Sequence, residues 1–431
     1  MNDPDHRFGH LYKIKKESLH FNPYATLLLL FTFTHHMLSS FYNKFRRITT
    51  NQLYFPEIDG IRFLAIVLVI LFHTHGYFIV KTPIHFTDDA TGYHLLNTLL
   101  MNGDRGVELF FVLSGFILCL PFAHHYINNG KKVLLKKYYL RRVTRLEPPY
   151  FIAMTAIFFM QLAMHLKPFS VLLPHWLASL GYAHDLIYHQ TPMLTVVAWS
   201  LEVEIQFYLL APLLFSLLKL PRNTRRAILL IATIALIIAQ WLYPPSFPSI
   251  YGFAQYFFIG ILLADLYVSD AAAGMLQKKW IAPAATLCLI AIIYFPIKDE
   301  RVSAAALFAT RLCFPFLLML FYYAVLKNGT LKKIFSFKFI PIIGGMCYSI
   351  YLLHYTIISM LGRFTLHLHI TDYYLPNLLL QLVLLGIPVL IISSIFYFYI
   401  ERPFMSKKWV DKLSKKSKED EGANMESELK G

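Results

Sequence analysis

The sequence predicts an all-α membrane protein, a polytopic helical bundle of about ten transmembrane helices with both termini in the cytoplasm. Of its 431 residues, 57% are hydrophobic and only 15% are charged, which is far from the balance of a soluble domain. The apolar segments are long enough to cross a bilayer as helices. We expect these spans at residues 62–82, 106–125, 149–166, 198–219, 227–244, 251–269, 280–297, 304–326, 341–362 and 376–400.

The distribution of basic residues predicts the orientation of these helices. Lys and Arg cluster in alternate connecting segments, at residues 44–47, 131–145, 219–226, 327–338 and 402–416. Basic connections stay on the cytoplasmic side of a membrane, and the intervening segments 83–105 and 167–197 are poor in Lys and Arg. Membrane topology therefore accounts for most of the net charge of +15. We expect contact with membrane lipids and no nucleic-acid partner.

The chain is expected to divide into three parts: an N-terminal segment (1–55), a membrane domain (56–405) and a disordered charged tail (406–431). The first part contains the apolar run YATLLLLFTF, which is followed by His35 and His36. We expect a helix lying in the cytoplasmic interface here, and a further span within residues 20–41 is the alternative. The four cysteines show neither paired nor zinc-binding spacing, so we expect no metal site.

Polar residues inside the predicted spans are the main functional signal, because a charge at that depth is costly. Arg62 and His73 lie eleven residues apart in the first span, which places them on one helical face about 16 Å apart. We expect a neutral His73 that can accept a proton. His75 lies about 200° further round the helix, so we expect it to pack elsewhere. A hydrogen bond between helices is the alternative role for both histidines.

The fourth span contains WSLEVEIQFYLLAPLL (199–214). Ser200, Glu204 and Tyr208 follow at steps of four and therefore share a face, whereas Glu202 points away from it. A buried carboxylate needs a cation or a donor. We hypothesise that Glu204 orients the ring of His73.

Two further spans carry polar residues. The second span has Glu108 near its outer end and Ser114 with Gly115 at its middle. Small residues allow helices to approach closely, so we expect packing at Ser114 and Gly115. In the ninth span Tyr351 and His354 are three residues apart and share a face; hydrogen bonding between helices and a role in the site are both open.

The segment YYLRRVTRLEPPY (138–150) is rich in arginine. Arg141, Arg142 and Arg145 have helical spacing and can converge, and Pro148 with Pro149 is expected to end this short segment before the third span. Arginine presents forked donors that match phosphate oxygens. The sequence therefore predicts a phosphate site, with anionic lipid head groups as the competing ligand.

Several motifs occur together in one order along the chain. They are IDGIRFLAIVLVILFH (58–73), GVELFFVLSGFIL (106–118), RRVTRLEPPY (141–150), WSLEVEIQFYLLAPLL (199–214), YSIYLLH (348–354) and ERPF (401–404). In this order they resemble the acyltransferase 3 family of integral membrane acyltransferases. The similarity covers about residues 55–405.

The resemblance implies transfer of an acyl group, often acetyl, from cytoplasmic acyl-CoA to a hydroxyl of a cell-envelope saccharide or lipid-linked glycan. It also implies a multi-pass protein of the bacterial inner membrane. Carried over by position, Arg62 lies on the donor side and His73 is the catalytic base. The family's acidic positions match Glu204 and Glu108, and its phosphate-binding motif matches Arg141, Arg142 and Arg145.

The residues and the resemblance together suggest a mechanism. We expect His73 to remove the acceptor hydroxyl proton as the oxygen attacks the thioester, or to carry the acyl group itself as an acyl-histidine relay. Two other functions stay open. Histidine and glutamate within helices also suit a proton-coupled transporter or exporter of a polar envelope metabolite, and a scaffold without activity is the third possibility.

Overall fold

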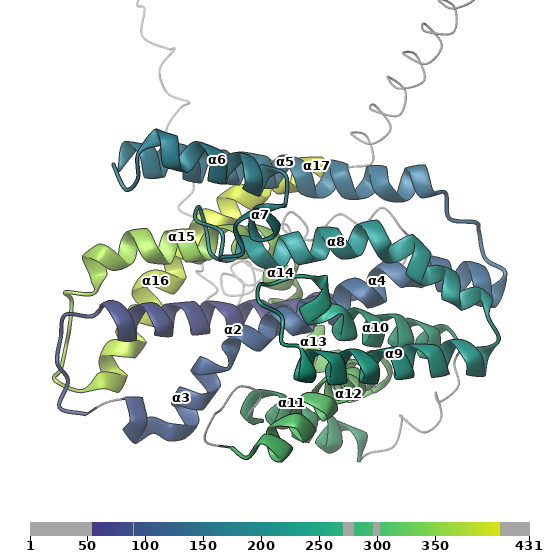
Figure 1. Cartoon of the computed structure of the whole chain (residues 1–431). Coiled ribbons are helices and arrows are strands. Elements are labelled where there is room, and N and C mark those ends of the chain that lie inside the picture. The colour runs from purple at the N-terminus through teal and green to yellow at the C-terminus, as the bar shows by residue number, and fades with distance from the viewer. Residues whose placement is uncertain (1–53, 89, 270–279, 296–301, 406–431) are drawn as a thin grey trace, which may run out of the picture. The chain divides into compact units, whose positions relative to one another are not determined.

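The computed structural model describes residues 54–88, 90–269, 280–295 and 302–405. In this part of the chain every regular element is a helix (Figure 1). Eight helices are long and apolar enough to cross a membrane. These are Pro56–Lys81 (α2), His94–Asn128 (α3 to α4), Leu135–Ala163 (α5), Ala198–Lys219 (α8 and η3), Arg222–Leu242 (α9), Ile250–Val268 (α10), Ala304–Lys327 (α12) and Tyr374–Phe404 (α16 to α17). The predicted all-α polytopic fold is confirmed.

The bounds of the remaining helices complete the bundle. Within the composite spans, α3 is His94–Met101, α4 is Gly106–Asn128, α8 is Ala198–Phe215, α16 is Tyr374–Phe396 and α17 is Arg402–Phe404. The other helices are α6 (Phe169–Leu180), α7 (His184–Tyr188), α11 (Ile281–Tyr294), α13 (Gly329–Phe335), α14 (Ile340–Gly345) and α15 (Cys347–Thr365).

Two of the ten predicted spans are helical but fall outside the eight. The span predicted at 280–297 contains α11, which has only 14 residues. The span predicted at 341–362 is divided into α14 and α15, with Met346 between them. Helix α15 is long enough, but its polar residues lower its mean hydropathy. Several of these polar residues are buried inside the bundle. The count of ten therefore stays a prediction.

The terminal segments lie outside the described residues. The predicted interfacial helix, the alternative span within residues 20–41 and the disordered tail thus stay predictions, as does the cytoplasmic location of both termini.

The prediction that Pro148 and Pro149 end the basic segment was wrong. Helix α5 runs without interruption from Leu135 to Ala163 and contains both prolines. A proline removes a backbone donor, but neighbouring helices can compensate for this within a membrane domain. Close to this point the hydroxyl of Tyr348 donates to the backbone oxygen of Leu146 at 2.9 Å. The arginines before the prolines therefore belong to a long helix of the bundle and not to a loop.

Glycines bring α4 and α10 into close contact. A Cβ atom added at Gly115 would collide with the backbone of Phe257, and one added at Gly260 would collide with the backbone of α4. The ring of Phe257 also stacks on that of Phe207 in α8, with centroids 4.0 Å apart. The predicted packing role of Gly115 is confirmed, and α4, α8 and α10 form one packed group.

Helix α2 is held in the same way on two sides. Gly106 of α4 lies against the backbone of Ala65, and Gly344 of α14 lies against the backbone of Asp59. Neither position has room for a side chain. This packing fixes the height of Arg62 and His73 relative to α4 and α14.

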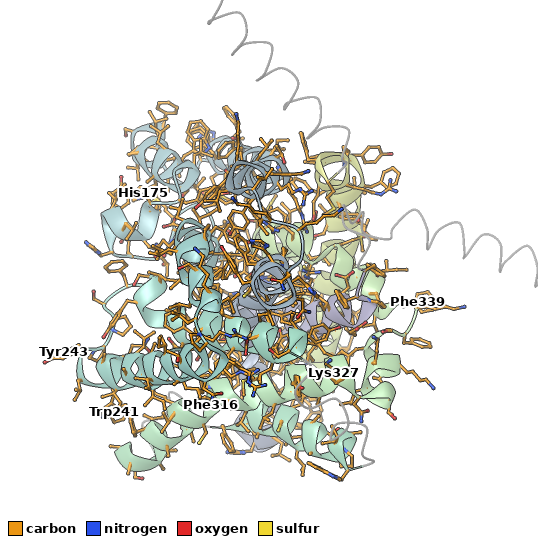
Figure 2. All side chains as sticks on the ribbon, turned by 90° about the vertical axis from the view of Figure 1, so that its right-hand side faces the viewer. His175, Trp241, Tyr243, Phe316, Lys327 and Phe339 are labelled. Atoms are coloured by element: carbon orange, nitrogen blue, oxygen red, sulfur yellow. The ribbon has the colours of Figure 1, made fainter. Side chains whose placement is uncertain are left out.

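Apolar side chains cover the outside of several helices. Leu213 of α8 is 70% exposed and Ile231 of α9 is 66% exposed. Trp241 and Tyr243, at the end of α9, project from the periphery in Figure 2. Exposed aliphatic residues flanked by aromatic ones are typical of a surface that faces lipid and its interface.

Candidate active site

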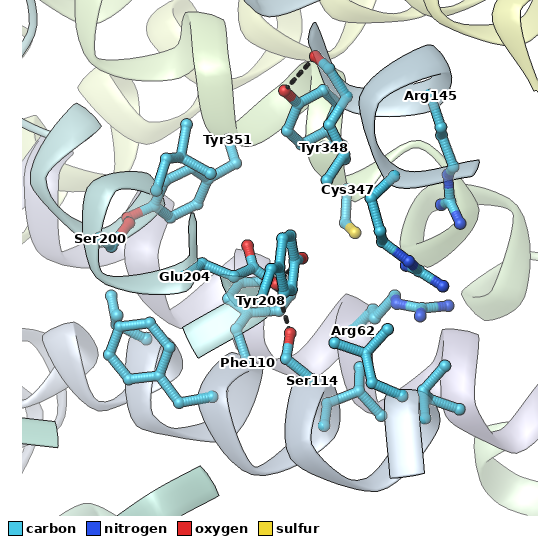
Figure 3. A pocket seen from close by; sticks show the side chains of 18 residues that line it. Arg62, Phe110, Ser114, Arg145, Ser200, Glu204, Tyr208, Cys347, Tyr348 and Tyr351 are labelled. Atoms are coloured by element: carbon cyan, nitrogen blue, oxygen red, sulfur yellow. Dashed lines mark hydrogen bonds between the residues drawn. The ribbon is translucent and has the colours of Figure 1, made fainter. Parts of the chain in front are cut away.

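Helices α2, α4, α5, α8 and α15 surround a cavity of about 120 Å³ (Figure 3). Arginines lie at one end of this cavity, while Ser200 and Tyr351 lie at the other. The polar and aromatic lining residues are Arg62, Phe110, Phe111, Ser114, Arg142, Arg145, Ser200, Glu204, Tyr208, Cys347, Tyr348 and Tyr351. The cavity thus has a basic end and an opposite end that we call the end wall, formed by Phe110, Ser200 and Tyr351.

The basic end consists of Arg62, Arg142 and Arg145. Arg62 pairs with Asp59 one turn earlier in α2. The guanidinium carbon of Arg142 lies 6.0 Å from the centre of the Tyr208 ring. The Nε atoms of Arg142 and Arg145 are buried and have no hydrogen-bond acceptor. Because a buried donor without a partner is costly, this end of the cavity offers unpaired donors to an anion.

The predicted convergence of three neighbouring arginines is only partly correct. Arg142 and Arg145 line the cavity, but Arg141 does not. A shift of one residue turns a side chain by about 100°, so Arg141 leaves the face that its neighbours share. Arg62 from α2 is the third guanidinium at this end.

The polar middle of the cavity centres on Glu204. Its Oε1 accepts hydrogen bonds from Ser114 of α4 and from Tyr208 one turn further along α8. The predicted shared face of Ser200, Glu204 and Tyr208 is confirmed, since all three line the cavity. Ser114, expected to serve in packing, is part of this polar group instead.

Glu202 points away from the cavity, as its spacing predicted. Its two carboxylate oxygens accept from the backbone N–H groups of His184 and Asp185, at 3.1 and 2.9 Å. Glu202 therefore ties α8 to α7.

The end wall is closed by a hydrogen bond. The hydroxyls of Ser200 and Tyr351 lie 2.6 Å apart, and Ser200 also donates to the backbone oxygen of Val197 at 3.1 Å. Because a serine hydroxyl has a single proton to donate, Tyr351 donates to Ser200. The ring of Phe110 meets that of Tyr351 edge-on, with centroids 5.9 Å apart.

His73 lies beyond the end wall and is not a lining residue. Its ring centre is 5.2 Å from that of His354 and 5.1 Å from that of Tyr355, both in α15. The predicted pairing of His73 with Glu204 was wrong. Glu204 is bonded to α4 and to its own helix, whereas His73 faces α15.

His354 connects the end wall to His73. Its ring centre is 5.6 Å from that of Tyr351, one turn earlier in α15. Its Nδ1 lies 2.8 Å from the backbone oxygen of Tyr351, so Nδ1 carries the proton and Nε2 is left as an acceptor. That Nε2 is buried and has no hydrogen-bond partner. The structure thus places two imidazoles together just beyond the cavity.

Two other predicted residues lie away from this arrangement. His75 is fully buried, its nearest aromatic ring is that of Tyr374 at 6.2 Å, and it points elsewhere than His73, as predicted. Glu108 is buried outside the cavity, close enough to Arg105 for electrostatic attraction. Glu108 does not line the cavity, but it is also close enough to Tyr351 of the end wall for an electrostatic interaction.

Some lining residues were not predicted as site residues. Phe110 is one apolar residue among many in α4, so spacing gave no signal for it. Cys347 and Tyr348 precede Tyr351 by about one turn in α15, and their place in the YSIYLLH segment was the available hint. No group of three or more metal-binding side chains occurs among the described residues.

Arginines and imidazoles buried inside a membrane bundle are typical of a functional site. The sequence comparison gives the family. Residues 55–398 match the acyltransferase 3 family, described as an acyltransferase domain. The chain therefore belongs to this family of acyltransferases.

Curated relatives agree with this assignment. The chain is 27% identical to a peptidoglycan O-acetyltransferase, OatA, of Listeria monocytogenes, over 84% of this chain and 57% of the relative. It is 24% identical to the O-acetyltransferase OatA of Staphylococcus aureus, over 82% of this chain and 58% of the relative. The chain thus spans somewhat more than half the length of these relatives. No solved structure is significantly similar to it.

Proposed function

We propose that this protein transfers an acetyl group from cytoplasmic acetyl-CoA to a hydroxyl of a cell-envelope saccharide, in the inner membrane of a bacterium. Membership of the acyltransferase 3 family supports acyl transfer. The names of the two relatives support acetyl as the group, and that of the Listeria protein supports peptidoglycan as the acceptor. A lipid-linked glycan is the alternative acceptor.

The observation that carries this proposal is the pair of unsatisfied arginines at the basic end. Two guanidinium Nε donors are buried there without an acceptor, and a third guanidinium, that of Arg62, lies in the same lining. Coenzyme A carries several phosphate charges, and forked guanidinium donors match phosphate oxygens. An anion at this end would satisfy the donors that the protein leaves unpaired.

The remaining geometry suits the rest of the donor. Arg62 and His73 both lie in α2, eleven residues apart, so the helix rise separates them by about 16 Å. This separation is similar to the reach of the slender pantetheine arm. Glu204 lies midway and is a hydrogen-bond acceptor, and we assign it to the amide N–H groups of that arm. The thioester then lies towards the end wall, with the imidazoles just beyond.

The proposed chemical step uses His73 as general base. Neutral His73 takes the proton of the acceptor hydroxyl while the hydroxyl oxygen attacks the thioester carbon. The carbon–sulfur bond breaks, and the leaving thiolate takes the proton from the imidazolium, so the reaction neither consumes nor releases a proton. The free Nε2 of His354 accepts a hydrogen bond from that imidazolium, the role first predicted for Glu204. An acyl group resting on His73 is the alternative order of steps.

The test uses the purified full-length protein in detergent, acetyl-CoA labelled in the acetyl group and a soluble peptidoglycan saccharide as acceptor. Wild type should release CoA, and His73→Ala should lower the rate about 100- to 10,000-fold, as expected for loss of a general base. His75→Leu is the matched control in the same helix and should retain the wild-type rate. Equal rates for wild type and His73→Ala would remove His73 from the mechanism.

Two further observations separate the competing functions. Cells with and without the protein should differ in one ester on an envelope glycan, which base-labile acetate release and mass spectrometry of the glycan would detect. Uptake of a solute by proteoliposomes with no cleavage of acetyl-CoA would instead favour the transporter. A protein inactive in both assays, with unchanged glycans, would indicate a scaffold.

A further inference from the structure

The orientation of a bound donor follows from the unequal ends of the cavity, if the proposed function holds. Phosphates are drawn to the basic end, where Arg142 and Arg145 have unpaired buried donors. The acyl group is the only part of the donor that is both apolar and distant from the phosphates. It therefore faces the end wall formed by Phe110, Ser200 and Tyr351.

The end wall is closed in this structure by packing and hydrogen bonds. Tyr351 is 6% exposed and Ser200 is 4% exposed, and their hydroxyls are joined at 2.6 Å. Ser200 is in turn bonded to Val197 in its own chain segment. The ring of Phe110 abuts the ring of Tyr351 from a third helix. Moving Tyr351 aside would cost a buried hydrogen bond and a packed ring contact.

We propose that Phe110, Ser200 and Tyr351 determine which acyl donors the protein accepts, admitting acetyl and excluding longer chains. The inference rests on the proposed function and deepens it, because it assigns the donor's chain length to particular residues. Packed cavities discriminate by volume: one additional methylene in a hydrophobic pocket lowers catalytic efficiency roughly 10- to 200-fold. The hydroxyl of Tyr351 fixes the ring, and the ring supplies the bulk.

The experiment compares acetyl-, propionyl-, butyryl- and hexanoyl-CoA with the full-length protein in detergent and a soluble peptidoglycan saccharide as acceptor. CoA release gives kcat/KM for each donor, and the rise in melting temperature gives binding without catalysis. Wild type should prefer acetyl-CoA over butyryl-CoA at least tenfold in kcat/KM. Tyr351→Ala and Phe110→Ala should each reduce that ratio tenfold or more, and hexanoyl-CoA should then stabilise the variants as well as acetyl-CoA does.

Matched variants distinguish a specific effect of the end wall on chain length from a general disturbance of the cavity. Tyr348→Ala removes the same side chain one turn earlier in α15, in the cavity lining but outside the wall, and should change the overall rate without changing the ratio. Tyr351→Phe keeps the ring and should keep the preference for acetyl. Tyr351→Leu and Phe110→Leu, which remove less volume, replace the alanine variants if those fail to fold.

The possible outcomes separate the two proposals. Wild type that binds and cleaves acetyl- and hexanoyl-CoA equally overturns the end-wall proposal and leaves the proposed function intact. The same conclusion follows if Tyr348→Ala relaxes chain length as much as Tyr351→Ala does. Wild type that neither binds nor cleaves any acyl-CoA overturns both.

Discussion

Two histidines two residues apart in α2 have different surroundings. His73 lies beside the ring of His354, whereas both ring nitrogens of His75 are buried with no hydrogen-bond partner among the described residues. The proposed chemistry requires His73 to reach a substrate, and His354 links His73 to the end wall through ring contacts. At the scale of single residues, position relative to the cavity separates the candidates for catalysis from the structural residues.

Loss of a basic-end arginine should weaken donor binding. Arg145→Ala should raise the KM for acetyl-CoA roughly tenfold or more, because a hydrogen bond to a charged group contributes about 1.5–3 kcal/mol. The difference in KM between wild type and Arg145→Ala should shrink at high salt, because screening weakens the attraction that only the wild type has. Initial rates of CoA release at several salt concentrations would measure both.

Arg141→Ala is the control for this measurement. Arg141 belongs to the same helix but does not line the cavity. The KM of the Arg141→Ala variant for acetyl-CoA should therefore stay near the wild-type value. An equal rise in KM for both variants would mean that the general positive charge of α5 attracts the donor and that the basic end has no specific role.

His354 should act through His73. His354→Ala should lower kcat roughly tenfold or more with little change in the KM for acetyl-CoA, because the hydrogen bond to the imidazolium forms only during reaction. A purely structural role would lower the yield of folded protein and leave the kcat of the folded fraction unchanged. Steady-state kinetics on the monodisperse fraction distinguishes these results.

Helical spacing predicted directions of side chains but not their neighbours. It correctly placed Ser200, Glu204 and Tyr208 on one face, and it separated His73 from His75. It failed for the pair of His73 and Glu204, because helical spacing does not show which helix packs against which. The convergence of Arg62 with the arginines of α5 depends on the same missing information.

At the scale of elements, α5 and α15 depart most from expectation. The prolines of α5 were expected to end a helix, as they commonly do in water, but α5 continues through both of them, and Tyr348 of α15 bonds the backbone oxygen of Leu146 nearby. Helix α15 is too polar to be recognised as a span from its mean hydropathy. It contains Ser349, Tyr351 and His354, which are buried inside the bundle. In both cases tertiary contacts override a local rule.

Helices α9 and α10 are joined by a buried ion pair. Asp265 is fully buried and accepts from Arg225 at 2.7 Å and from Arg226. Asp265→Ala would leave Arg225 buried without its counter-ion, and we expect a loss of about 3–5 kcal/mol in stability. The melting temperature in detergent would show this, with exposed Arg222→Ala as control. An unchanged melting temperature for Asp265→Ala would contradict the structural role.

At the scale of the whole described part, composition and hydropathy were sufficient for the fold class. Eight of the ten predicted spans coincide with helices that are long and apolar enough to cross a membrane, because a segment in lipid must be a long apolar helix. Composition and hydropathy could not find the cavity, which depends on which helices pack together. The basic residues predict the orientation, and orientation can be measured directly.

Opposite ends of the spans should face opposite sides of the membrane. His85 follows α2 and Lys131 follows α4, and both are exposed. In a variant without the four native cysteines, a membrane-impermeant maleimide should label His85→Cys in intact cells. Lys131→Cys should react only after the membrane is opened. The reverse pattern would overturn the predicted topology.

The hydrogen bond between Tyr351 and Ser200 has a consequence for water. A thioester held in an open channel would be exposed to hydrolysis from the far side throughout the time between donor loading and acceptor arrival. If the proposed function holds, the two joined hydroxyls close this passage until an acceptor arrives and shield the thioester from water. We therefore expect little hydrolysis of acetyl-CoA in the absence of an acceptor saccharide, so that the cell loses little activated acetate.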